Sequence, residues 1–118
     1  MHEMSIARSL LEVIERYAPT NGRARVKIVR LRIGELAGVV PESLRFCFEV
    51  ASEGTVAQGA ELQIEHVPLI GRCRACGADF HVEGYIFICP HCESPHVELI
   101  SGDELEVVEL EVEDVRCP

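Results

Sequence analysis

The chain has 118 residues, of which 47% are hydrophobic and 26% are charged, the balance of a folded protein rather than a disordered one. Its formal net charge of −9 at pH 7 opposes binding to nucleic acid, because phosphates repel an acidic surface. Apolar runs reach only about five residues, as at Tyr85 to Cys89, whereas roughly 20 are needed to cross a bilayer. No secretory signal is expected at the start. Nucleic-acid and membrane partners are therefore not expected.

Two helices are predicted in the first half of the chain. Between Ser5 and Tyr17 apolar residues recur every three or four positions, and the stripe expected to be buried is Ile6, Leu10, Val13, Ile14 and Tyr17. Pro41 suits the first turn of a second helix, whose expected apolar stripe is Leu44, Cys47, Phe48 and Ala51. The residues from Gly34 to Val40 are expected to form a loop before it.

Three segments alternate as strands do. Arg25 to Ile33 changes phase at Ile28–Val29, which indicates a β-bulge or burial on both faces. Glu61 to Val67 carries Leu62, Ile64 and His66 on one expected face. Asp103 to Val115 changes phase at Val107–Val108 and carries seven acids: Asp103, Glu104, Glu106, Glu109, Glu111, Glu113 and Asp114. These acids are interpreted as a solvated strand face that also discourages edge-to-edge aggregation.

Between the second and third of these strands lies a segment of different composition, rich in cysteine and proline. The last strand needs a sheet to join, and the first part of the chain supplies one. The predicted fold is therefore α+β, with a small mixed three-stranded sheet and two helices that carry an inserted zinc-ribbon-like four-cysteine module. The expected domains are 1–67 for the first part of the α/β domain, 68–102 for the module and 103–118 for the return strand.

The four paired cysteines predict a metal site. Cys73 and Cys76 form one Cys-x-x-Cys pair, and Cys89 and Cys92 form another, which together offer four thiolates to a tetrahedral ion. A module of this size cannot fold on apolar burial alone, so the metal is expected to be structural Zn²⁺. Iron in a rubredoxin-like electron carrier is the rival, whereas disulfides suit a secreted protein better.

The remaining cysteines and the nearby histidines receive simpler interpretations. Cys47 is expected to be a small buried hydrophobe, and Cys117 a free thiol without a role. His81 is expected to be an exposed loop histidine. His91 lies inside the second Cys-x-x-Cys pair and could compete with a cysteine at low pH. His96 is a candidate from this module for the fourth ligand of a second metal site, at the N-terminus, for which the Glu3 carboxylate is the alternative.

Several motifs together resemble the HypA/HybF family of nickel metallochaperones for [NiFe] hydrogenases. They are Met1-His2-Glu3-Met4-Ser5, Gly34-Glu35-Leu36, Pro41-Glu42-Ser43-Leu44-Arg45-Phe46, Glu53-Gly54-Thr55, the paired cysteines and Ser101-Gly102-Asp103-Glu104-Leu105. The resemblance implies a nickel site at the N-terminus, at His2 and Glu3, with Ni²⁺ as transported cargo and a structural zinc at the cysteines. It also implies cytoplasmic work beside a nickel-handling maturation GTPase, with delivery to the hydrogenase large-subunit precursor.

Enzymatic activity is not expected. The glycines Gly34 and Gly38 lack the Gly-Lys-Ser/Thr that a phosphate-binding loop requires, and no nucleophile elbow is present. Two other functions stay open at this stage: a zinc-ribbon adaptor for protein interaction and the rubredoxin-like iron protein. Metal analysis separates them, since nickel in addition to zinc is expected only for the metallochaperone.

Overall fold

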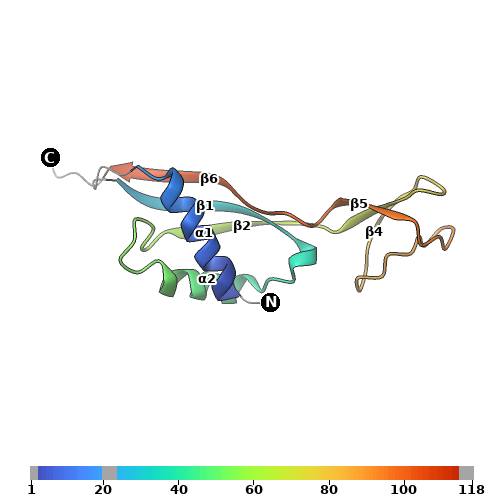
Figure 1. Ribbon diagram of the computed structural model, residues 1–118, viewed down its shortest axis with the longest axis horizontal. Coiled ribbons are helices and arrows are strands. Elements are labelled where there is room, and N and C mark those ends of the chain that lie inside the picture. The colour runs from blue at the N-terminus through green and yellow to red at the C-terminus, as the bar shows by residue number, and fades with distance from the viewer. Residues whose placement is uncertain (1–2, 20–23, 115–118) are drawn as a thin grey trace. The chain divides into compact units, whose positions relative to one another are not determined.

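The computed structural model describes residues 3–19 and 24–114, and there the elements follow the predicted order (Figure 1). The helices are α1 (Glu3–Tyr17), the short 3-10 helix η1 (Glu35–Ala37) and α2 (Pro41–Ala51). The strands are β1 (Ala24–Gly34), β2 (Glu61–Val67), β3 (Ile70–Cys73), β4 (Asp79–His81), β5 (Val97–Ser101) and β6 (Leu105–Asp114). None of the helices in this part of the chain is long and apolar enough to span a membrane.

Strands β2, β1 and β6 form a three-stranded sheet in that order. Arg30 and Arg32 on the central strand meet β2 in ascending order, at Gln63 and Glu65, as parallel strands require. The same two arginines meet β6 in descending order, at Glu111 and Glu106, as antiparallel strands require. The sheet is thus mixed, as predicted, and the strand directions can be followed in Figure 1.

The acidic strand β6 is more than a solvated face. Glu109 and Glu111 form ion pairs with Arg30, and Glu106 forms one with Arg32. These side chains remain well exposed, so each pair contributes at most about 1 kcal/mol to stability and is screened by salt. Their clearer effect is on the register of β6 against β1. The acids of β6 repel one another, and the fold favours the register that places them beside the arginines of β1.

The chain forms two compact units. The described residues of the first are 3–19, 24–32, 39–65 and 106–114, which include both long helices. The second contains residues 33–38 and 66–105, with the antiparallel sheet β4-β3-β5. The domain limits expected from composition, at residues 68 and 102, stay a prediction. The structure adds the short segment 33–38 to the cysteine-bearing unit.

The first unit is built around the packing of α1 against α2. The helix residues that are buried there are Ile6, Ala7, Leu10, Leu11, Ile14, Leu44 and Phe48. Tyr17 was expected on this stripe but is 72% exposed, because Leu11 and Ala7 rather than Val13 and Tyr17 widen the buried face. Cys47 is half-buried, not buried as predicted.

The burial pattern of the strands agrees only in part with the expected one. In β1 the buried positions change phase between Val26 and Val29, as the sequence predicted. In β2 Leu62 and Val67 are buried whereas His66 is exposed, so the expected face of Leu62, Ile64 and His66 is wrong. The last strand begins at Leu105 rather than 103, and position 115 lies outside the described residues.

Candidate metal centre

The two Cys-x-x-Cys segments adopt the same turn. In the first, the Gly77 N–H donates to the Cys73 carbonyl at 2.8 Å, and the Cys73 N–H donates to the Ala78 carbonyl. In the second, the Glu93 N–H donates to the Cys89 carbonyl at 2.9 Å, and the Cys89 N–H donates to Ser94. Both turns also aim a backbone N–H at the first sulfur of the pair, from Cys76 and His91 respectively, at 3.4 Å.

Each turn requires a residue with positive φ directly after its second cysteine. Gly77 supplies it in the first turn, at φ +79°, without steric cost. Glu93 occupies the equivalent position in the second turn, at φ +63°. A residue with a Cβ is held there against its preference, so the second turn contains a local strain that the first does not.

These turns bring four sulfur atoms together. The Sγ atoms of Cys73, Cys76, Cys89 and Cys92 all lie within 4.8 Å of one another. Cys73 and Cys92 are 3.4 Å apart, and Cys76 and Cys89 are 3.6 Å apart. A tetrahedral ion with metal–sulfur bonds of ~2.3 Å needs sulfur separations of roughly 3.8 Å. The donor set and its spacing therefore fit one tetrahedral ion.

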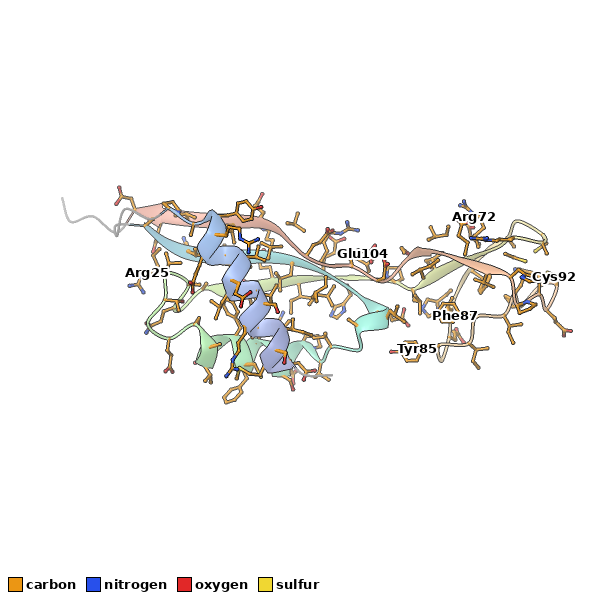
Figure 2. The ribbon with its side chains drawn as sticks, in the orientation of Figure 1. Arg25, Arg72, Tyr85, Phe87, Cys92 and Glu104 are labelled. Carbon is orange, nitrogen blue, oxygen red and sulfur yellow. The ribbon has the colours of Figure 1, made fainter. Side chains whose placement is uncertain are left out.

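Burial divides the four ligands evenly. Cys73 and Cys89 are buried, whereas Cys76 and Cys92 are exposed, and Figure 2 shows Cys92 in the turn region that precedes β5. Within the described residues, this is the only group of three or more histidine, cysteine, aspartate or glutamate side chains arranged to hold a metal. Four thiolates complete a tetrahedral coordination sphere, which indicates a structural rather than a catalytic ion.

The sulfur atoms differ in how readily they lose a proton. The Cys76 N–H, which points at the Cys73 sulfur, is the main reason that the pKa of Cys73 falls to about 6. The Ser94 N–H alone would lower the pKa of Cys92, but the neighbouring Cys73 sulfur and desolvation raise it to about 12. Negative charge is thus favoured on Cys73, whereas a metal that binds the cluster must displace the proton of Cys92.

The histidines of the module lie outside this sulfur cluster. His81 is on β4, not in a loop as predicted, and its Nε2 lies 2.8 Å from Oε1 of Glu35. His91 and His96 are exposed. The His91 N–H donates to the Cys89 sulfur, and the His96 N–H donates to the Ser94 hydroxyl oxygen. None of the three joins the four-sulfur group.

Glu35 is a residue whose role the sequence reasoning missed. Its Oε1 also accepts a hydrogen bond from the Leu69 N–H, at 3.0 Å. The bond from Leu69, followed by that from His81, lowers the pKa of Glu35, and the same carboxylate raises the pKa of His81. The motif Gly34-Glu35-Leu36 was the available signal, but only the structure shows that its partners are 34 and 46 positions away.

Gly34, the first residue of the motif Gly34-Glu35-Leu36, allows this segment to lie close to the backbone at Gly102. The Gly34 N–H donates to the Glu104 carbonyl and the Leu36 N–H to the Gly102 carbonyl. A Cβ on Gly34 would lie 2.0 Å from the Gly102 carbonyl oxygen, so the two backbones can approach only because residue 34 has no side chain. Residues 33–38 are in this way fixed to the module that carries the cysteines.

The predicted nickel residues fall at the limit of the described chain. His2 lies outside the described residues. Glu3 is the first residue of α1, and its Oε2 accepts a hydrogen bond from the Val40 N–H at 3.2 Å. Within the described residues, the structure therefore gives the Glu3 carboxylate a backbone partner at the start of α2.

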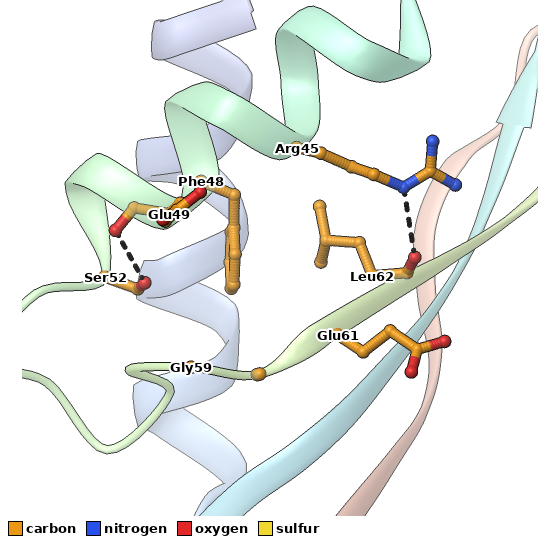
Figure 3. Close-up of a pocket in the computed structure, with 8 residues that line it drawn as sticks. Arg45, Phe48, Glu49, Ser52, Gly59, Glu61 and Leu62 are labelled. Carbon is orange, nitrogen blue, oxygen red and sulfur yellow. Dashed lines mark hydrogen bonds between the residues drawn. The ribbon is translucent and has the colours of Figure 1, made fainter.

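A cavity of about 320 Å³ opens between α2 and the start of β2 (Figure 3). Arg45 lines it, and its Nε donates to the Leu62 carbonyl at 3.4 Å. Ser52 is buried there and donates to the Glu49 carbonyl. The acidic side chains of Glu49 and Glu61 at its rim oppose an anionic ligand, and the cavity contains none of the metal-binding cysteines.

Comparison with known proteins gives consistent results over nearly the whole chain. The family model described as hydrogenase/urease nickel incorporation metallochaperone HypA matches residues 1–112. A hydrogenase maturation factor HypA of Geobacter metallireducens is 49% identical over 113 residues, which cover 96% of this chain and 100% of that protein. The HypA of Chlorobium limicola is 44% identical over 114 residues, covering 97% and 98%.

A solved structure resembles this chain over nearly its whole length. The solution structure of the Ni metallochaperone HypA from Helicobacter pylori superposes with a TM-score of 0.64 at 26% identity. The aligned region covers 94% of this chain and 97% of that chain. The similarity thus extends over both the helices and the cysteine module.

Proposed function

Because the chain belongs to the HypA family of nickel-incorporation metallochaperones, we propose that it binds Ni²⁺ at its N-terminus and delivers it for maturation of [NiFe] hydrogenase. The match of the family model to residues 1–112 is the observation that carries this proposal. The recipient is the hydrogenase large-subunit precursor, and a nickel-handling GTPase is the partner in the cytoplasm.

The proposed nickel site is built from His2 and the backbone beside it. The His2 imidazole Nδ1 and the His2 amide nitrogen close a six-membered chelate ring, and either the Glu3 amide or the Met1 amine adds a five-membered ring. Deprotonated amides are strong in-plane donors that favour square-planar Ni²⁺ over Zn²⁺, which has no such geometric preference. The first four N–H groups of a helix have no intrahelical acceptor, so deprotonating the Glu3 amide breaks no helical bond.

The four-cysteine centre is proposed to hold structural Zn²⁺. Four thiolates at tetrahedral spacing support this choice, although the same donor set also accepts iron. The zinc would supply the folding free energy of the module. Two sites of different donor type, nitrogen at one and sulfur at the other, can then sort two metals without exchange between them.

Titration of untagged protein with Ni²⁺ tests the proposal, with His2→Ala as the variant and His66→Ala, at an exposed histidine of β2, as the matched control. His2→Ala should abolish specific nickel binding and leave the zinc content and the circular dichroism unchanged. The affinity of the parent should fall as the pH drops through the imidazole range near ~6.5, because binding releases protons. Equal Ni²⁺ affinity of His2→Ala and parent would show that the N-terminal site is wrong.

Metal analysis of the purified protein separates the other functions. Nickel bound in addition to one zinc supports the metallochaperone. Zinc alone, with no added nickel after titration, supports a zinc-ribbon adaptor instead. A coloured and reducible iron centre supports the rubredoxin-like electron carrier.

A further inference from the structure

Strand β6 is an open edge of its sheet. In the order β2-β1-β6, the described residues give β6 a single neighbouring strand, β1 (Figure 1). The other side of its backbone faces away from the sheet, where N–H and C=O groups can pair with a further strand. Proteins commonly shorten such edges or interrupt them with proline. This edge instead runs for 10 residues, Leu105–Asp114, and contains no proline.

An apolar groove of about 510 Å³ lies between α1 and this strand. Val13 and Tyr17 of α1 line one wall, and residues 107–110 of β6 line the other. Tyr17 is 72% exposed and Val108 is 56% exposed, and both belong to the same compact unit. A tyrosine exposed at the side of an apolar groove is typical of an interaction site, because its rigid ring provides a large contact area with little loss of conformational entropy.

The ion pairs of β6 lie on one face of the sheet. Arg30 and Arg32 alternate along β1 with the buried Leu31, and successive strand residues point to opposite faces. The ion pairs that these arginines form with three acids of β6 therefore lie on the face away from Leu31. A strand added beside β6 would thus meet the apolar groove on one face and carboxylates on the other.

The charge of β6 limits the partner that this edge can accept. The strand carries no base and these acids: Glu106, Glu109, Glu111, Glu113 and Asp114. Arg30 and Arg32 pair with three of them and so compensate only part of the charge. A second copy of β6 would place acids opposite acids, which destabilises a strand pair, whereas lysine or arginine opposite the carboxylates stabilises it. The edge therefore disfavours a second copy of this chain and favours a basic strand.

We propose that the open edge of β6 and the groove beside it form a docking site for an extended basic segment of a partner protein. The segment pairs with β6 as a further strand of the sheet, a mode of recognition in which backbone hydrogen bonds provide affinity and alternate side chains provide specificity. Its apolar side chains enter the groove beside Tyr17, and its basic side chains lie next to the carboxylates on the opposite face. The site involves neither the proposed nickel residues nor the cysteines, so it goes beyond the proposed function and does not depend on it.

Titration of the untagged, zinc-loaded protein with a synthetic peptide tests this docking site by NMR. The probe is acetyl-Lys-Val-Lys-Val-Lys-Val-Lys-amide, which alternates basic and apolar side chains as the proposed segment does. One control peptide has glutamate in place of lysine, and a second has the same residues in blocks, with the lysines first. The alternating basic peptide should shift the amide resonances of β6 and of the last turn of α1, with a Kd of at most about 1 mM. Both control peptides should bind at least roughly tenfold more weakly.

Matched protein variants assign the binding to the groove and to the acids. Tyr17→Ala should weaken binding of the basic peptide roughly five- to tenfold, whereas Phe46→Ala, at a similarly exposed aromatic residue of α2, should stay within about twofold of the parent. Glu113→Lys should weaken binding roughly three- to fivefold at low salt and less at high salt. Glu53→Lys, at an exposed acid that follows α2, should stay within about twofold. Val108→Ser, on the other wall of the groove, repeats the groove test if Tyr17→Ala alters the fold.

Other results would overturn the docking site. One is the absence of binding by the basic peptide near about 1 mM, or binding that leaves the β6 resonances unmoved. Equal affinities of the alternating and block peptides would show attraction by charge alone, without strand pairing. A dimer that dissociates in Tyr17→Ala, seen by sedimentation velocity, would make the occupant a second copy of this chain instead of a basic partner.

Discussion

Replacing Glu93 by glycine should strengthen metal binding by the four-cysteine centre, whereas replacing Gly77 by alanine should weaken it. The two residues occupy equivalent positions in two turns with the same hydrogen bonds, and both have positive φ. A Cβ added at Gly77 would have no heavy atom within 4 Å. The alanine variant therefore changes only the conformational preference of the backbone.

The magnitude follows from the left-handed conformation. A residue with a Cβ is destabilised by about 1–2 kcal/mol in this conformation. Glycine avoids this cost, but the greater entropy of its unfolded chain offsets about 0.4–1 kcal/mol of the gain in folding free energy. Glu93→Gly should thus stabilise the folded module by about 0.5–1 kcal/mol, and Gly77→Ala should destabilise it by about 1 kcal/mol. Metal binding supplies the folding free energy of such a module. The zinc affinity should therefore rise roughly two- to fivefold in Glu93→Gly and fall roughly fivefold in Gly77→Ala.

Competition with a chromophoric chelator at constant pH measures both affinities, and thermal unfolding of the zinc-loaded proteins gives the stability difference independently. Changes in the same direction for the two variants would refute the reasoning. If the melting temperature shifted while the zinc affinity stayed the same, metal binding would not be coupled to folding. The metal-free and metal-bound modules would then carry the same backbone strain.

Three further predictions concern the same module. Cys73→Ala should release zinc and unfold residues 70–100 while the α-helical circular dichroism remains, and an ordered module after complete zinc removal would contradict a structural role for the metal. Glu35→Gln should lower the raised pKa of His81 toward 6.5 in an NMR titration. The pair stabilises the fold fully between about pH 4.5 and 6.5; it loses this stabilisation as the pH rises through the raised pKa of His81 or falls through the lowered pKa of Glu35. The stability deficit of the variant should therefore be larger at pH 6 than at pH 9. Gly34→Ala should cost about 3 kcal/mol or more in chemical denaturation, because its Cβ would overlap the Gly102 carbonyl, and a near-neutral effect would show that these backbones separate easily.

Local patterns carried most of the correct predictions. The Cys-x-x-Cys pairs determine their own turns, so the sulfur cluster could be inferred from spacing. The helices and strands follow from apolar periodicity. The face of β2 could not be inferred, because this strand leaves one compact unit for the other between Glu65 and His66. Each unit has a core of its own, so alternation that begins with Leu62 does not continue to His66.

Contacts between distant residues were beyond the reach of sequence patterns. The hydrogen bond between Glu35 and His81 joins positions 46 apart, and the one that the Val40 N–H donates to Glu3 joins positions 37 apart. In each case the sequence shows only an acidic residue at the start of a helix, for which the helix dipole is a sufficient explanation. The partner is decided by the tertiary fold, so the role of the carboxylate became visible only with the structure.

The pairing of β3 with β5 has a consequence for the strand that completes the first sheet. Residues 68–104 separate β2 from β6, and the β3–β5 pair places Ile70 opposite Ser101. While the module is folded, only the few residues outside the β3–β5 pair act as a flexible connection between β2 and β6. When the module is unfolded, the connection is a loop of roughly 37 residues. Closing the longer loop costs about 2 kcal/mol more in chain entropy. Metal bound at the cysteines thus favours the pairing of β6 with β1 through loop length alone, and after zinc removal the amide protons of β6 should exchange faster while those of α1 and α2 remain protected.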